Sequence, residues 1–218
     1  TARADADALT QAADSNDGKA DDGRTIDDIM ASMTDNQGNP VYANAVITEI
    51  GPENLTSLPI SVSSWAGSSS VEEADRIADA LGGVLASAST IWDEERSQEV
   101  ADAISGSVDE EGEYGRVTVL NAILSRDDDG NGVNDLDFGS SFLIDLANKL
   151  DDIDYKTIGR ATAYPKYDGG DVVFGSEPVI GLGQADTRAK ILGDSMDWHS
   201  FDPMTGVLKA MGGNPDAA

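Results

Sequence analysis

The hydrophobic residues of this chain recur mostly at intervals of three and four residues, with polar residues between them. That spacing places apolar side chains on one face of an α-helix. The stretches that show it are 26–33, 42–50, 71–85, 93–105, 117–124, 142–150 and 204–211. Together they predict a mainly α-helical fold, a multi-helix globular bundle in which each helix turns its apolar stripe toward a shared core.

The expected helix ends carry recognisable start and stop residues. Thr25, with Asp28 three residues further on, has the pattern of a capping box. Asn39 and Asp202 are each followed by proline, which suits a helix that begins with a side-chain cap and has proline at its first position. Gly51 is typical of a helix stop. These residues support separate helices joined by short turns.

The first residues of the chain depart from this pattern. From residue 2 to residue 14 the sequence is largely Ala and Asp, and Leu9 is its only large apolar side chain. Such a stretch favours a solvated helix or a frayed end. We therefore expect residues 1–24 to form an acidic N-terminal segment and residues 25–218 to form the helical domain.

A long stretch between the last two predicted helices lacks helical spacing. Residues 155–186 are punctuated by glycine and proline, and a segment of this length without helices commonly has a function or covers the rest of the domain. We expect it to be irregular, with at most a minor β-hairpin in which residues 172–174 pair with residues 179–182.

Charge narrows the classes of partner. The 218 residues are 39% hydrophobic, enough for a real core, and carry a formal net charge of −27. Nucleic acids and anionic membranes are themselves polyanions, so we expect neither as a partner, whereas a protein partner is compatible with this charge. No apolar run approaches the roughly 18 residues of a membrane span. With no cysteine, disulfides and thiolate sites are excluded.

One loop between two predicted helices has the spacing of a calcium site. Oxygen ligands fall at its first, third, fifth, seventh and ninth positions, namely Asp127, Asp129, Asn131, the carbonyl of Val133, and Asp135. Calcium takes several such hard oxygens at about 2.3–2.6 Å, and a glycine at the sixth position allows the sharp bend. The sequence therefore predicts calcium as a cofactor at this loop.

The end of the loop departs from the EF-hand pattern. Phe138 stands at the twelfth position, where an EF-hand has a bidentate Glu. The loop instead resembles the calcium loops of dockerins and thrombospondin type 3 repeats, in which a late Asp is usual, although Asp137 comes one residue early. The alternative is a turn rich in Asp, Asn and Gly that only joins two helices.

The chain has few side chains of the kinds that commonly act as catalysts, with one histidine and no cysteine. His199 is the only histidine, and beside two aromatic residues it is more typical of a packed or capping residue than of a general base. We therefore expect that the chain is not an enzyme and has no catalytic residues. Two alternatives stay open: a hydrolase with an unidentified carboxylate site, and an acidic binding or inhibitor module for a basic partner protein.

Several segments, in the same order, resemble an uncharacterised helical domain family of large actinobacterial proteins linked to type VII (ESX-type) secretion and polymorphic toxins. The matching segments are 42–55, 81–89, 142–150 and 202–218. They consist of caps and core positions, so the resemblance implies a fold and gives no catalytic residues. The calcium-like loop is not part of the family pattern.

The resemblance implies a function and a location. It suggests a non-catalytic scaffold or carrier domain of a larger secreted or cell-surface protein, possessing no reaction of its own and associated with a toxin. The final residues, from Asn214 onward, have the pattern of a new helix start. We therefore expect the chain to be a fragment of a longer protein.

Overall fold

The computed structural model describes residues 1–15, 17–63, 71–109, 115–128, 133–153, 165–168, 171–174 and 202–217. Its elements are α1 (Ala2–Asp14), α2 (Ile26–Asn36), α3 (Pro40–Ile50), the 3₁₀ turn η1 (Pro52–Asn54), α4 (Leu58–Ser63), α5 (Val71–Ser89), α6 (Glu94–Val108), α7 (Gly115–Leu124), α8 (Ser140–Asp151), β1 (Pro165–Asp168), β2 (Asp171–Phe174) and α11 (Met204–Gly213). The fold is mainly α-helical, as the hydrophobic spacing predicted.

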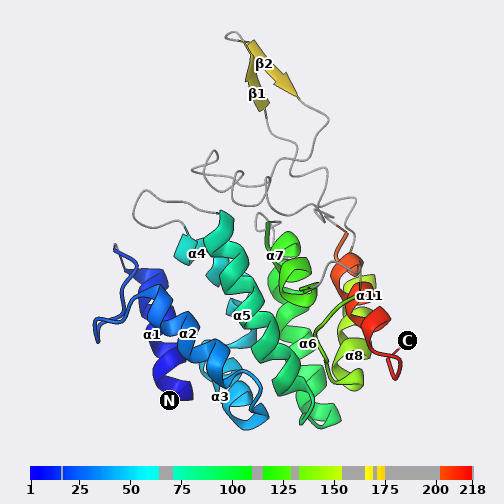
Figure 1. Ribbon diagram of the computed structural model, residues 1–218. Helices are drawn as coiled ribbons and strands as arrows, with labels where there is room; N and C mark the ends of the chain where they lie inside the picture. The colour runs from blue at the N-terminus through cyan, green and yellow to red at the C-terminus, as the bar shows by residue number, and fades with distance from the viewer. Residues whose placement is uncertain are drawn as a thin grey trace.

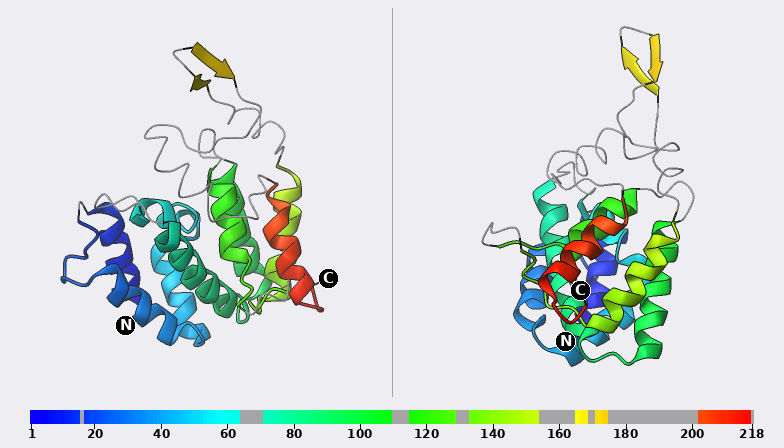
Figure 2. Two further views of the ribbon diagram at one scale, coloured as in Figure 1. Left: turned by 45° about the horizontal axis from the view of Figure 1, so that its top comes forward. Right: turned by 90° about the vertical axis from the view of Figure 1, so that its right-hand side faces the viewer.

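Helix α5 lies at the centre of the bundle. It packs against α2, α3 and α4 on one side and against α7 on the other. Helix α1 covers α3 at one flank, and α8 and α11 pack together at the other, so the chain crosses the molecule from its N-terminal to its C-terminal helix (Figure 1; Figure 2). The buried apolar residues of these helices form one continuous cluster.

The helix starts predicted at Thr25 and Asn39 are confirmed, whereas α11 begins one residue later than predicted, at Met204, with Pro203 in place of Asp202 at its N-cap. The backbone N–H of Asp28 donates to Thr25 Oγ1 at 3.3 Å, and the N–H of Thr25 donates to Asp28 Oδ2 at 3.0 Å, which completes the capping box. Asn39 Oδ1 accepts from two N–H groups in the first turn of α3. Gly51 ends α3 with φ of +82°, a conformation that favours glycine.

The N-terminal segment differs from its prediction. Helix α1 is neither solvated nor frayed, because Ala6, Ala8, Leu9 and Ala12 are buried in the common core. These four small or medium side chains are enough to bury one face of α1, because α1 packs directly against α3. Residues 1–24 are therefore not a separate acidic segment outside the helical domain.

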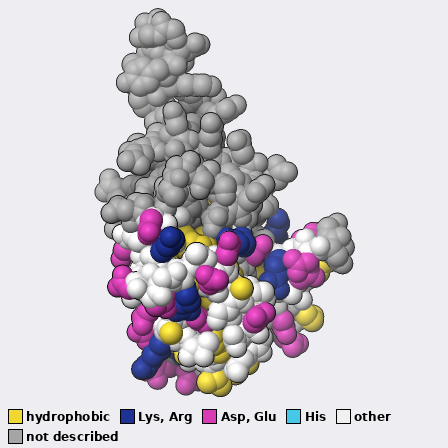
Figure 3. Space-filling view, turned by 60° about the vertical axis from the view of Figure 1, so that its left-hand side comes forward, with side chains coloured by type: hydrophobic (Ala, Val, Ile, Leu, Met, Phe, Trp, Pro, Cys, Tyr) yellow, Lys and Arg dark blue, Asp and Glu magenta, His cyan; other side chains and the backbone are white. Residues whose placement is uncertain are grey.

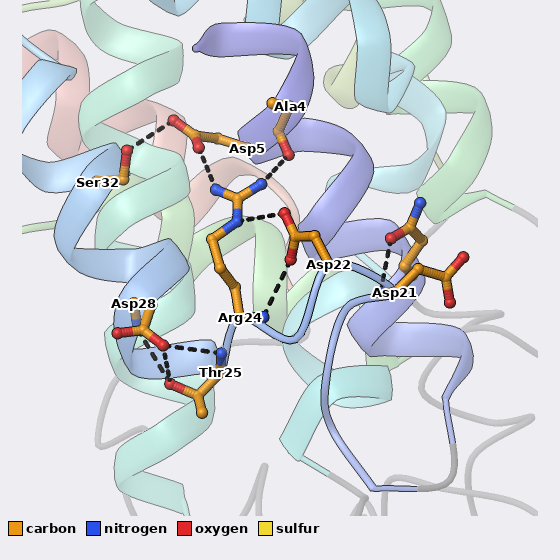
Figure 4. A network of polar contacts seen from close by, with 9 residues as sticks. Ala4, Asp5, Asp21, Asp22, Arg24, Thr25, Asp28 and Ser32 are labelled. Atoms are coloured by element: carbon orange, nitrogen blue, oxygen red, sulfur yellow. Dashed lines mark hydrogen bonds and ion pairs between the residues drawn. The ribbon is translucent and has the colours of Figure 1, made fainter.

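A buried polar network holds α1 in place. Asp5, only 1% exposed, accepts at Oδ1 from Arg24 Nη1 at 2.5 Å and at Oδ2 from Ser32 Oγ at 2.8 Å and the hydroxyl of Tyr42 at 2.7 Å. Arg24 is held in turn by Asp22 at 2.7 Å (Figure 4). Burial, and then the hydrogen bond to Asp5, raise the pKa of Tyr42, so its hydroxyl remains a donor. The network thus ties α1 to α2 and α3.

Helix α11 is fixed at both ends by buried asparagines. Asn121 Oδ1 accepts from the N–H of Gly206 at 2.8 Å, and Asn121 Nδ2 donates to the carbonyl of Asp202 at 3.1 Å. At the other end, Asn214 Nδ2 donates to the carbonyl of Phe138 at 2.5 Å. A Cβ at Gly206 would lie 2.8 Å from the Cα of Asn121, so only glycine allows this approach.

Two further details correct the sequence predictions. Leu208 belongs to the stretch 204–211, whose helical spacing predicts that it faces inward, but it is 56% exposed. The small residues Gly206 and Ala210 allow α11 to pack close to α7. The buried face of α11 is therefore centred on these residues, and Leu208 lies outside it. In the hairpin, residues 171–174 pair antiparallel with 165–168, where 179–182 had been expected. Strands β1 and β2 are joined by only two residues, which is a common length for a β-hairpin connection and shorter than the one predicted. Residues 179–182 lie outside the described chain.

One face of the molecule mixes both signs of charge despite the net charge of −27. On the face shown in Figure 3, Asp and Glu side chains are widely spread, with Lys and Arg side chains between them. This face is therefore not a single dense acidic patch.

A first prediction concerns the contact of α5 with α7. A Cβ at Gly82 would overlap the carbonyl oxygen of Ile123 and lie 3.2 Å from Leu136 Cδ1. Gly82→Ala gains up to about 1 kcal/mol of helix propensity, but overpacking costs about 1–3 kcal/mol, so we expect net destabilisation in urea unfolding. Gly106→Ala in α6 is the matched control, because nothing lies within 4 Å of its Cβ; it should stabilise. Equal stabilisation by both would contradict the packing.

A second prediction concerns the buried network. Asp5→Ala leaves Arg24, Ser32 and Tyr42 without their shared acceptor, and we expect a loss of about 3 kcal/mol in the free energy of unfolding. Asp22→Ala removes the exposed partner of the same Arg24 and should cost much less. Chemical denaturation of both variants measures the difference. Similar losses would mean that the burial of Asp5 is not what makes the network strong.

Candidate functional site

The described ends of the predicted calcium loop lie at the surface. Asp127, Asp128 and Asp135 are exposed, and Val133 is 51% exposed. Two of the five predicted ligands, Asp129 and Asn131, lie outside the described residues. As predicted, the loop joins two helices whose apolar faces are buried, α7 and α8.

Hydrogen bonds bring the two ends of the loop together. The N–H of Asp128 donates to Asp135 Oδ2 at 2.6 Å, and the N–H of Asp135 donates to the carbonyl of Arg126 at 2.7 Å. The ninth loop position, Asp135, is thereby bonded to the backbone of the two residues that flank the first position, Arg126 and Asp128. Of the predicted ligand side chains, the structure thus places Asp135 beside the start of the loop.

Asn134 is the residue that closes the loop, and sequence analysis missed it. Its Oδ1 accepts from the N–H groups of Arg126 and Leu136 at 3.0 and 3.1 Å, and its Nδ2 donates to the carbonyl of Leu124 at 2.6 Å. The bond to Leu136, two residues on, is an Asx turn, which asparagine commonly forms. That local preference was a usable signal, whereas the bonds to Leu124 and Arg126 depend on the fold.

The ligand set remains a prediction. Among the described residues, no group of three or more His, Cys, Asp or Glu side chains is arranged to hold a metal ion. Asp129, Asn131 and the backbone between them stand outside that search. His199, the only histidine, is also outside the described chain.

A cleft adjoins the loop. It has a volume of about 430 Å³ and lies between the turn from α2 to α3, helix α5, and the far side of the loop. Gln37 contributes from the turn, Gly83 from α5, and Arg126, Asp135 and Asp137 from the loop. The cleft therefore shares Asp135 with the predicted calcium site.

Two residues that line this cleft each have one polar side-chain atom that is buried away from solvent and has no hydrogen-bond partner among the described residues: Gln37 Oε1 and Arg126 Nε. Arg126 Nε lies 3.4 Å from Asp128 Oδ2, close enough for an ion pair but without hydrogen-bond geometry. A Cβ at Gly83 would overlap Gln37 Oε1 and stand 3.4 Å from Arg126 Nη1. The amide and the guanidinium therefore lie near each other over the bare backbone of Gly83.

The described helices give no sign of a membrane segment. None of them combines the length and the apolar character needed to cross a bilayer. The fold and the loop define the chain more closely: it is a mainly α-helical domain with an acidic surface loop and a polar cleft.

Comparison with known proteins places this domain in a family. Residues 1–218 match a family described as a family of unknown function, DUF6571, and the chain belongs to that family. No curated protein and no solved structure matches the chain. Function must therefore be inferred from the residues themselves.

A third prediction follows from the role of Asn134. Asn134→Ala leaves two N–H groups and one carbonyl without their partner, and we expect a loss of about 1–3 kcal/mol in the free energy of unfolding. Val133→Ala, at the neighbouring exposed position, should change it by no more than about 0.5 kcal/mol. Urea unfolding of the two variants provides the comparison. Equal effects would show that Asn134 does not organise the loop.

Proposed function

We propose that this chain is a non-catalytic helical scaffold or carrier domain whose loop at residues 127–135 is stabilised by calcium. The observation that carries the proposal is the hydrogen bond from the N–H of Asp128 to Asp135 Oδ2, 2.6 Å long. It closes a loop whose sequence has oxygen side chains at the ligand positions of a calcium site.

Electrostatics favours a cation at this loop. Closure brings the carboxylate of Asp135 beside Asp128, which is the middle one of three consecutive aspartates in a chain of net charge −27. Like charges at close range disfavour the folded state, and a bound cation offsets that repulsion. Calcium suits the loop better than magnesium, because magnesium demands a tighter octahedral shell.

The scaffold role is supported by the continuous core that runs from α1 to α11. The carrier role, the secreted or cell-surface location and the association with type VII secretion and toxins are proposals supported by the resemblance of residues 42–55 and 202–218 described above. The same resemblance supports the absence of catalysis, because its motifs are caps and core positions.

The alternative of an acidic inhibitor for a basic protein remains a prediction. It requires one dense acidic face that would steer a basic partner onto the chain. The face in Figure 3 instead intersperses both signs of charge. That distribution favours the scaffold proposal over the inhibitor alternative, as far as this face is concerned.

The decisive experiment compares melting temperature with calcium and with chelator, at constant ionic strength. A site with a dissociation constant of about 10⁻⁴–10⁻³ M, as in extracellular calcium modules, stabilises the native state by about 1.4–2.7 kcal/mol at about 10 mM calcium. We expect this gain in the wild type and its loss in Asp129→Ala. Magnesium at the same concentration should give a much smaller shift.

Asp128→Ala is the matched control, because it removes one aspartate of the same run at a position outside the predicted ligand set. It should keep the calcium-dependent gain. If calcium raises the melting temperature of all three proteins equally, or of none, the loop is a turn and the calcium proposal fails.

A further inference from the structure

Helix α1 lies at one flank of the bundle, and little apolar surface holds it there (Figure 1). It packs against α2, α3 and α4, whereas the central helix α5 packs against α2, α3, α4 and α7. The buried side chains of α1 are those of four alanines, Leu9 and Asp5. Leu9 is the one large apolar side chain among them, so the hydrophobic contribution of this 13-residue helix is small. The helices around α5 keep their mutual contacts if α1 leaves.

The polar contacts of Asp5 divide at the end of the loop that follows α1. Within residues 1–24, Arg24 Nη1 donates to Asp5 Oδ1 at 2.5 Å (Figure 4). Across the boundary, Asp5 Oδ2 accepts from the hydroxyls of Ser32 in α2 and Tyr42 in α3, at 2.8 and 2.7 Å. The charged partner of Asp5 therefore belongs to the same segment as Asp5, whereas these two partners on the bundle are neutral.

A joint departure of residues 1–24 leaves no charge without its partner at this point. Asp5 keeps Arg24, and the surface beneath keeps two neutral hydroxyls. Breaking a buried ion pair is costly chiefly because one charge stays buried alone, and that cost does not arise here. The ion pair from Arg3 to Glu49 also crosses the boundary, but the Arg3 side chain is 83% exposed, so that pair contributes little.

Net charge adds a repulsion between the two parts. Residues 1–24 contain six Asp and three Lys or Arg, a net charge of −3, which leaves −24 for the rest of the chain. Parts of like net charge repel each other, and salt screens that repulsion over a Debye length of about 10 Å at about 0.1 M. The contact of α1 with the bundle should therefore weaken as the ionic strength falls.

We propose that residues 1–24 form a releasable cover: α1 and the loop that follows it detach as one unit while the bundle around α5 stays folded. Low ionic strength favours the release. The released state uncovers Tyr42 and the surface of α2 and α3 against which α1 packs. Such a partial opening has a lower free energy than global unfolding.

Hydrogen exchange of the full chain, followed by NMR at several urea concentrations below the unfolding transition, tests the proposal. We expect the hydrogen-bonded amides of α1 to share one protection factor, at least about tenfold below that of the core amides of α5. The protection of α1 should depend weakly on urea and that of α5 strongly, because urea acts on the surface exposed in each opening. Raising sodium chloride from about 20 to about 500 mM should increase the protection of α1.

Variants separate release from global unfolding. Val207→Ala truncates a fully buried side chain of α11, on the opposite flank from α1 (Figure 1). It should lower the protection of α5 at least about fivefold and leave that of α1 unchanged, because the bundle is intact in the docked and the released states. Arg24→Gln leaves the Asp5 carboxylate buried among neutral partners and should lower the protection of α1 at least about tenfold. Arg3→Gln removes the same charge from an exposed position and should have little effect.

Each contrary result has its own signature. If α1 and α5 share one protection factor and one urea dependence, or if Val207→Ala lowers both equally, α1 opens only with the whole molecule and the proposal fails. Protection that changes steadily from the first to the last turn of α1 shows fraying instead of release as a unit, and also overturns it. Equal effects of Arg24→Gln and Arg3→Gln exclude a role for the pair of Asp5 with Arg24. Protection of α1 that does not rise with added salt excludes the control by ionic strength.

Discussion

The close contact between α5 and α7 is the constraint on which the functional half of this molecule depends. Gly82 lies so near the carbonyl of Ile123 that no side chain fits between the helices. This fixes the end of α7 and with it the start of the acidic loop. The neighbouring Gly83 leaves the space in which Gln37 and Arg126 approach each other. Two consecutive glycines in a helix thus reduce its intrinsic stability and yet position both candidate sites.

The sequence predicted the helices well because their signals are local. Apolar residues three and four apart, the Thr25 capping box and Gly51 all act within one or two turns. Helix α1 was misjudged because its stability is not local. Asp5 is buried only through Arg24, Ser32 and Tyr42, which are 19, 27 and 37 residues away. In sequence, such an aspartate looks like a solvated surface residue.

The two candidate sites differ in the same way: the loop has a local sequence signal and the cleft does not. The loop could be predicted because a cation site within nine residues has a fixed ligand spacing. The cleft could not, because Gln37, Gly83 and Arg126 come from three segments that only the packed fold brings together. The inward face of α11 was misplaced for a related reason. Small residues at 206 and 210 pack more closely than the larger side chains on which hydrophobic spacing relies.

Asn121 and Asn214 have a wider consequence for the sequence that joins α8 to α11. Because α11 packs against α8 and is anchored at both ends, Ile153 after α8 and Asp202 before α11 are fixed points next to neighbouring helices. The entropic free-energy cost of closing a loop between fixed points grows slowly, by about 0.6 kcal/mol for each doubling of the loop length. A change in the length of the sequence that joins these two points would therefore add little to the free energy of closing the loop between them.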